Sequence, residues 1–121
     1  MGKFQVVAPD EGNVISLPLA TIAVKSTDAD LAEGRIVGEL TAEPGFSGPG
    51  PHHHSGQAEL FYVLDGEFTF QVEGEEILLR LGMSLIISPD TIHNFANASA
   101  NPAKLLVIGA AEEIGLYSTV N

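Results

Sequence analysis

Short runs of apolar residues, alternating or continuous, follow one another along the chain and are separated by glycine, proline and aspartate. Residues 14–25 are mostly β-branched or apolar and are broken by Pro18, which predicts an early strand at a sheet edge. Residues 35–42 alternate and end before Pro44-Gly45, which predicts another strand followed by a turn. No segment keeps a helical period, so the pattern predicts an all-β sandwich or barrel.

The rest of the chain continues this pattern of short strands. Residues 60–64 form an apolar run that closes at Asp65-Gly66, a favoured hairpin turn, and residues 67–73 alternate again. We interpret this stretch as a meander. Residues 112–117 fit either a closing helical turn or a last strand. Further strands are expected at 77–81, 84–87, 92–96 and 104–108.

The composition is that of one folded domain. The 121 residues are 45% hydrophobic and 17% charged, which suits a compact core and excludes a disordered chain. We therefore expect a single domain over residues 1–121. Sixteen acidic against five basic side chains give a formal net charge of −11, so nucleic acid is not an expected partner.

Other function classes are excluded by what the chain lacks. It has no cysteine, which excludes disulfides, thiolate metal sites and cysteine nucleophiles. No apolar stretch is long enough to span a membrane, and Gly2 is no myristoylation signal because Val6 stands where Ser or Thr is needed. We expect a soluble, cytoplasmic protein.

Three of the four histidines stand together behind a loop that is rich in proline and glycine. This loop, residues 44–51, leads directly to His52. On a strand, alternation would point His52 and His54 to one side and His53 to the other. Glu59 follows after a short turn that can bring its carboxylate toward the same point.

Imidazole and carboxylate groups together suit a divalent transition metal ion. Such a set leaves coordination positions open, which is the property of a catalytic site. The alternative for the histidine run alone is a solvated loop with a surface glutamate. The remainder of the sequence pattern favours the metal site.

The stretch around these residues resembles the first motif of the cupin family. In this chain the motif consists of His52-x-His54, four residues, Glu59, six residues and Gly66. The glycine that the family has before the histidines is shifted here, but no ligand lies at that position.

Residues 82–97 resemble the second cupin motif and end in His93-x-x-x-Asn97 after a short apolar strand. Asp90 replaces a glycine of the family pattern, and Ser88 replaces its first proline. Aspartate tolerates left-handed backbone geometry better than most residues, so we expect the turn to survive. The two motifs together cover nearly half of the chain.

The resemblance implies a double-stranded β-helix, the jelly-roll barrel of the cupins, that holds one divalent metal ion. The four ligands it implies are His52, His54, Glu59 and His93. The ion would be Fe, Ni, Mn, Co, Cu or Zn, because such a ligand set accepts several metals. A homodimer is also expected, from the family and from an edge strand that needs covering.

Three phenylalanines are expected to line a substrate pocket: Phe46, Phe61 and Phe95. Phe61 lies two residues after Glu59 and Phe95 two after His93, so alternation places both on the ligand-bearing face. The alternative is barrel core, since pocket and core merge in a small barrel. Other side chains are expected in the core or facing away: Phe70, Tyr62 and His53.

Residues 44–49 and 61–66 look like the small single-domain cupins that are grouped with the quercetin 2,3-dioxygenases. This resemblance implies a metal-dependent enzyme acting on a small molecule, with dioxygenase chemistry as its sharpest form and Glu59 as the catalytic proton acceptor. The alternatives are an isomerase or lyase, a barrel that only binds a small ligand, and a structural barrel.

Overall fold

A computed structural model describes residues 2–53 and 56–110 of the chain. Every element of regular secondary structure assigned in these residues is a β-strand, in agreement with the all-β prediction. Residues 112–117, for which helix and strand were both open, lie outside the described residues. The strands are β1 (Asn13–Leu17), β2 (Ala20–Val24), β3 (Arg35–Ala42), β4 (Glu59–Asp65), β5 (Glu67–Val72), β6 (Glu75–Arg80), β7 (Ser84–Ile87), β8 (His93–Ala96) and β9 (Ala103–Ala110).

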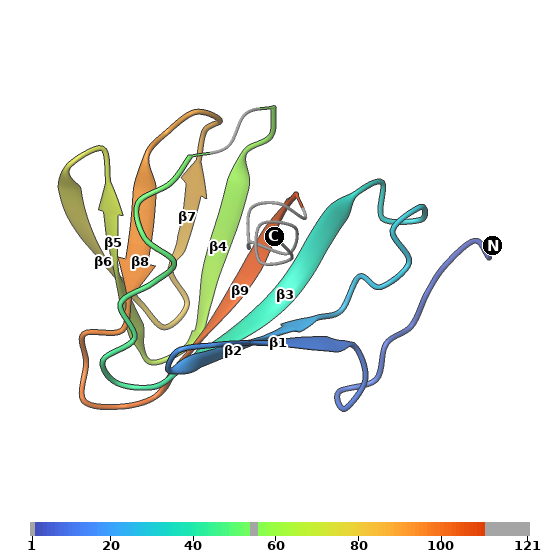
Figure 1. Cartoon of the computed structure of the whole chain (residues 1–121), viewed down its shortest axis with the longest axis horizontal. Coiled ribbons are helices and arrows are strands. Elements are labelled where there is room, and N and C mark those ends of the chain that lie inside the picture. Colours follow the sequence, from blue (N-terminus) through green and yellow to red (C-terminus); the bar gives the residue numbers. More distant parts are fainter. Residues whose placement is uncertain (1, 54–55, 111–121) are drawn as a thin grey trace.

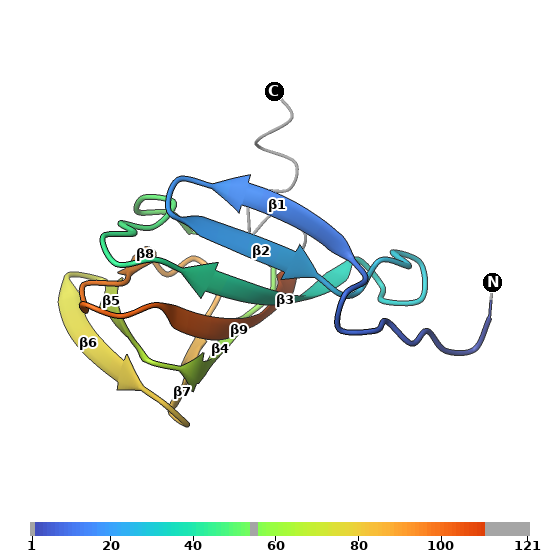
Figure 2. The same ribbon diagram turned by 90° about the horizontal axis from the view of Figure 1, so that it is seen from below.

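The strands form two antiparallel sheets that enclose the core (Figures 1 and 2). The larger sheet has the order β1-β2-β3-β9-β4-β7, and the smaller has the order β6-β5-β8. Large apolar side chains from both sheets are buried between them, among them Leu40, Phe61, Phe68, Phe70 and Leu105. This arrangement confirms the predicted jelly-roll barrel.

Residues 14–25 form a hairpin, so the prediction of a single strand there was wrong. Leu17 pairs with Ala20 across a turn that contains Pro18 and Leu19. Proline ends β1 because it has no amide hydrogen to donate to the ladder, and Leu19 takes a positive φ of 63° in the turn. β1 lies at the edge of the larger sheet, where the strand was expected.

The turn at Asp65-Gly66 does not close a hairpin, which corrects the predicted meander. β4 pairs with β7 and β9, whereas β5 pairs with β6 and β8, so the chain passes from one sheet to the other at this turn. A Cβ on Gly66 would lie 2.9 Å from the Cβ of Ala103. The hairpin turn is at Glu73-Gly74, between β5 and β6, where both residues have positive φ.

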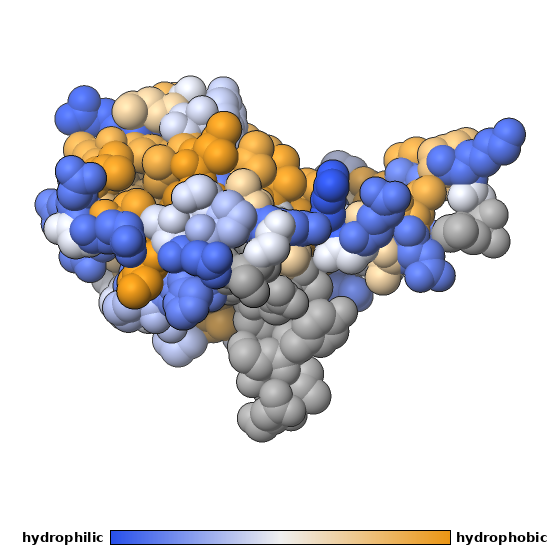
Figure 3. Space-filling model, turned by 90° about the horizontal axis from the view of Figure 1, so that it is seen from above, coloured by the Kyte–Doolittle hydropathy of each residue, from blue (hydrophilic) through white to orange (hydrophobic). Residues whose placement is uncertain are grey.

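The face of the molecule drawn in Figure 3 combines hydrophilic side chains with areas of apolar side chains. Several large apolar residues are more than half exposed, including Phe4, Val14, Leu81 and Ile86. No helix among the described residues could cross a membrane.

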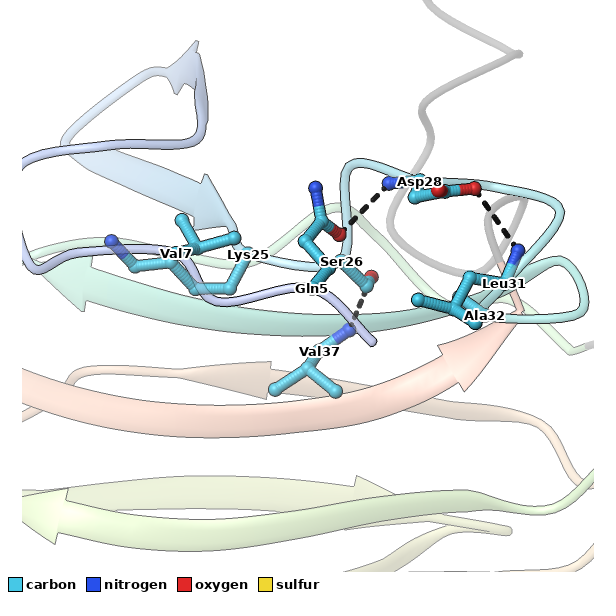
Figure 4. A pocket seen from close by; sticks show the side chains of 8 residues that line it. All are labelled: Gln5, Val7, Lys25, Ser26, Asp28, Leu31, Ala32 and Val37. Atoms are coloured by element: carbon cyan, nitrogen blue, oxygen red, sulfur yellow. Dashed lines mark hydrogen bonds between the residues drawn. The ribbon is translucent and has the colours of Figure 1, made fainter. Parts of the chain in front are cut away.

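The segment before β1 is tied to the loop between β2 and β3. The ammonium group of Lys25 donates hydrogen bonds to three main-chain carbonyl oxygens of the segment, those of Ala8, Pro9 and Glu11. The side chain of Gln5 accepts a hydrogen bond from the amide of Asp28 and donates one to Thr27. Segment and loop border a hollow of about 310 Å³ (Figure 4).

Candidate metal centre

Three of the four predicted metal ligands lie together between the two sheets. Glu59 begins β4 in the larger sheet, His93 begins β8 in the smaller sheet, and His52 ends the proline- and glycine-rich loop. One ligand atom of each lies within 4.8 Å of the others. His54 lies outside the described residues, so its place in this cluster stays a prediction.

The alternation of β4 brings Glu59 into the interior. Glu59, Phe61 and Val63 are at most 3% exposed, whereas Leu60 and Tyr62 between them are 38% and 42% exposed. A carboxylate is costly to bury unless it is paired or bound to a cation. The burial of Glu59 therefore indicates a functional role and distinguishes it from a surface glutamate.

His52 belongs to a loop, yet the backbone of β8 aligns it with His93. The amide of each residue donates a hydrogen bond to the carbonyl of the other, at 3.0 and 2.8 Å. Side chains of directly opposite residues lie on one face of an antiparallel pair, and the two ring centroids are 4.3 Å apart. His53, the next residue, is exposed as expected.

Both histidines use the same ring nitrogen for a hydrogen bond to the main chain. Nδ1 of His52 lies 2.7 Å from the carbonyl oxygen of Gly50, and Nδ1 of His93 lies 2.8 Å from that of Thr91. A carbonyl oxygen only accepts, so Nδ1 is the protonated donor in each ring. Nε2 is thereby left as the nitrogen that binds a metal, in an orientation set by the backbone.

The contact between Glu59 and His93 is consistent with this donor set. Oε1 of Glu59 lies 2.7 Å from Nε2 of His93, and both atoms use a lone pair to bind either a proton or a metal ion. Without a metal, one proton between the two atoms would satisfy both lone pairs. A divalent ion would replace that proton, since metal ligands must be deprotonated. The residues present therefore fit a divalent metal ion.

The loop that carries His52 rests directly on β8 through two residues that the sequence analysis did not assign to the site. The side chain of Asn94 accepts a hydrogen bond from the amide of Gly50 and donates one to the carbonyl of Ser47. Gly48 has a φ of 84°, and a Cβ there would lie 2.1 Å from the carbonyl oxygen of Phe95. The glycine next to a proline was a signal of this close approach, whereas nothing in the sequence identified Asn94.

Asn97, the asparagine of the second motif, has a structural role. Its buried side chain donates hydrogen bonds to the carbonyls of Ala42 and Asn101 and accepts one from the amide of Ser99. It holds the turn after β8 and does not reach the metal cluster.

The three phenylalanines that were expected in a pocket belong to an aromatic cluster in the core. Phe46, Phe61 and Phe95 are 3%, 1% and 7% exposed. The ring of Phe95 lies 5.4 to 6.3 Å, centroid to centroid, from the rings of Phe46, Phe61, Phe68 and Phe70. The ring of Phe61 lies 6.2 Å from that of His93, so this cluster borders the ligands. Contact with a substrate stays a prediction for all three.

The comparisons with known proteins agree with this geometry. The cupin domain family matches residues 38–109, which include all the predicted ligands. No curated protein sequence matches the chain.

Solved structures of several activities share the fold. A predicted oxalate decarboxylase from Thermotoga maritima has a TM-score of 0.73 at 22% identity, over 88% of this chain and 99% of that one. The polyketide cyclase RemF from Streptomyces resistomycificus has a TM-score of 0.75 at 18% identity, over 90% and 80% of the two chains. Hydroxypropylphosphonic acid epoxidase from S. wedmorenis has a TM-score of 0.71 at 18% identity, over 88% and 59%.

Proposed function

The chain belongs to the cupin domain family, and from this we propose that it is a metal-dependent enzyme acting on a small molecule. The convergence of the Glu59 carboxylate with a ring nitrogen of His52 and of His93 carries the proposal. His54 completes the ligand set by its place in the first motif. Metal-binding histidines commonly donate their other ring nitrogen to a carbonyl oxygen, as Nδ1 of both residues does here.

A divalent ion held by these residues would supply Lewis-acid polarisation of a substrate oxygen and, if redox-active, access to dioxygen chemistry. Glu59 has two carboxylate oxygens, so one can serve as a ligand while the other accepts a proton from a substrate hydroxyl or enol. Glu59 and His93 are only 3% and 2% exposed, which keeps the proton acceptor in a largely dry environment.

The more specific form of the proposal is that the enzyme is a dioxygenase of the quercetinase type. It is supported by the resemblance around the first motif and by a ligand set rich in imidazole. Structures with this fold include a predicted decarboxylase, a cyclase and an epoxidase, so the fold alone is compatible with several reactions. Isomerase or lyase chemistry at the same site is the second candidate.

The first test is the metal content of the protein, purified without a histidine tag and measured by plasma mass spectrometry. We expect near-stoichiometric metal in the wild type, its loss in His93→Ala and its retention in His53→Ala, the exposed neighbour of His52. A protein that neither carries metal nor takes it up on reconstitution would overturn the metal site and favour a structural barrel.

The second test separates the kinds of chemistry. The metal-loaded protein is incubated with flavonols and with smaller enols while oxygen uptake and substrate loss are followed together. Oxygen uptake that matches substrate loss supports a dioxygenase, and turnover without it supports an isomerase or lyase. Tight binding without turnover would favour a barrel that only binds its ligand.

A further inference from the structure

One peptide group of the chain contacts both His93 and a second carboxylate. The carbonyl oxygen of this group belongs to Thr91 and lies 2.8 Å from Nδ1 of His93. Its N–H belongs to Ile92 and donates a hydrogen bond to Oε2 of Glu73 at 3.0 Å. A single planar amide therefore joins the imidazole ring to the carboxylate of Glu73, which is not a member of the metal cluster.

Glu73 holds Ile92 at two points. Its main-chain amide donates a hydrogen bond to the carbonyl oxygen of Ile92 at 2.9 Å, while its side chain accepts one from the amide of the same residue. The two bonds continue the pairing of β5 with β8, in which Val72 lies opposite His93 (Figure 1). They therefore fix the two residues that precede His93.

The residue type at position 73 fits this contact better than it fits the turn. Glu73 has a φ of 50° in the tight turn before Gly74, where asparagine, aspartate or glycine is the usual choice. The glutamate side chain is longer than that of asparagine or aspartate, and here it reaches across to Ile92. It is exposed, so it contributes little to the core. The contact with the start of β8 is thus what this glutamate adds to the turn.

The carbonyl that faces the other histidine is supported differently. Nδ1 of His52 lies 2.7 Å from the carbonyl oxygen of Gly50, and the nitrogen of that peptide group belongs to Pro51. Proline has no N–H, so no acceptor can hold this peptide group through its nitrogen. The two histidines thus differ beyond their first hydrogen bond, and His52 provides an internal reference for His93.

We infer that Glu73 is a positioning residue for His93, and this inference rests on the proposed metal site. By holding the peptide group of residues 91–92, Glu73 keeps the Thr91 carbonyl aligned with Nδ1 and so keeps Nε2 directed toward Glu59. A charged acceptor also polarises the peptide group, which makes its carbonyl oxygen a stronger acceptor. Outer groups that orient a histidine in this way raise its affinity for a metal ion.

The affinity for zinc, measured by competition with a coloured chelator, tests this role. Glu73→Ala should weaken zinc binding about tenfold. Glu73→Gln loses the charge but keeps an accepting oxygen, so its affinity should stay within about threefold of the wild type. The control is Glu76→Ala, which removes the same charge from an exposed position of β6, opposite Gln71, and should leave the affinity unchanged.

Three results of this measurement would overturn the inference. The first is wild-type affinity in Glu73→Ala. The second is a loss in Glu73→Gln as large as that in Glu73→Ala, because the charge and not the hydrogen bond would then be responsible. The third is an equal loss in Glu76→Ala, which would have the same meaning. Urea unfolding of each variant shows that it is folded.

A second measurement does not depend on metal. Nitrogen-15 spectra of the metal-free protein, recorded through the carbon-bound ring hydrogens, report the hydrogen bond at Nδ1 of each histidine, and His52→Ala and His93→Ala assign the signals. In Glu73→Ala the Nδ1 signal of His93 should move to higher field while that of His52 stays in place. An unchanged His93 signal would overturn the inference. If the wild type took up no metal on reconstitution, the proposed function would fail, and these signals would still decide whether Glu73 acts on His93.

Discussion

His52 and His93 belong to one cluster and both have Nδ1 on a main-chain carbonyl oxygen, but the protein holds the two residues in different ways. His93 lies on β8, paired with Val72 of β5 on one side and with His52 on the other, and is 2% exposed. His52 is half-buried on a loop and has one strand neighbour, His93 itself. The strand ligand is thus part of the core, whereas the loop ligand depends on contacts made by its own loop.

Because of this difference, substitutions at the two residues should change folding stability and metal affinity to different degrees. A change at the strand ligand removes core packing and a metal ligand at once. A change at the loop ligand, or at the contacts that hold the loop, should reduce metal affinity with a smaller effect on folding. Four substitutions test this contrast, in decreasing order of expected effect.

His93→Ala should have the largest effect, because it removes a ligand and leaves Glu59 buried without the partner that lies 2.7 Å away. We expect metal affinity to fall by more than about 100-fold, beyond the range of indirect effects on a metal site. The metal-free protein should lose about 3 kcal/mol in its free energy of unfolding, measured in urea. His53→Ala is the control. If the stability of His93→Ala were unchanged, the statement that the strand ligand is part of the core would be contradicted.

Glu59→Gln keeps the shape of the buried side chain and replaces its negative charge. The new amide can donate a hydrogen bond to Nε2 of His93, so the metal-free stability should stay within about 1 kcal/mol of the wild type. Metal affinity should fall about 100-fold, since a neutral amide is a poor ligand for these ions. Competition with a coloured chelator measures the affinity. Wild-type affinity in this variant would show that Glu59 is not a ligand.

His52→Ala removes the loop ligand. We expect metal affinity to fall by about 30-fold and the free energy of unfolding by less than about 1 kcal/mol, because the side chain is only half-buried and the backbone pair with His93 remains. Urea unfolding of the metal-free protein beside His93→Ala makes the comparison direct. Equal losses of stability in the two variants would refute the distinction between loop and strand ligands.

Asn94→Ala removes two hydrogen bonds that fasten the loop to β8 and leaves every ligand in place. We expect an affinity loss of about tenfold and a stability loss of about 1 kcal/mol. In a His52→Ala background the same change should no longer lower the affinity, because the residue that it positions is gone. Gln71→Ala, directly across from Asn94 on β5, is the control. An additive affinity loss in the double variant would contradict the positioning role.

The strands were largely predictable because most of them bury a single face. The ranges 35–42 and 84–87 coincide with β3 and β7, where apolar and polar residues alternate or the apolar run is short. The same alternation placed Glu59 and Phe61 on the inward side of β4. A period of two residues is a local property, so a short window of sequence contains it.

The pairing of strands was not predictable to the same degree. A favoured turn dipeptide at Asp65-Gly66 indicated a hairpin, but the chain changes sheets there, and β9 enters between β3 and β4. Which strands become neighbours depends on how apolar faces far apart in the sequence pack together, and no dipeptide carries that information.

The sequence by itself determined the all-β class, the family motifs and the residue types of the metal site, because these follow from local periodicity and spacing. Only the tertiary structure decided how the ligands meet. His52 faces the interior because residues 44–51 rest on β8, through Asn94 and the missing side chain of Gly48. Such contacts join segments more than 40 residues apart, as Gly50 and Asn94 are, and they exist only once the two sheets have closed around the core.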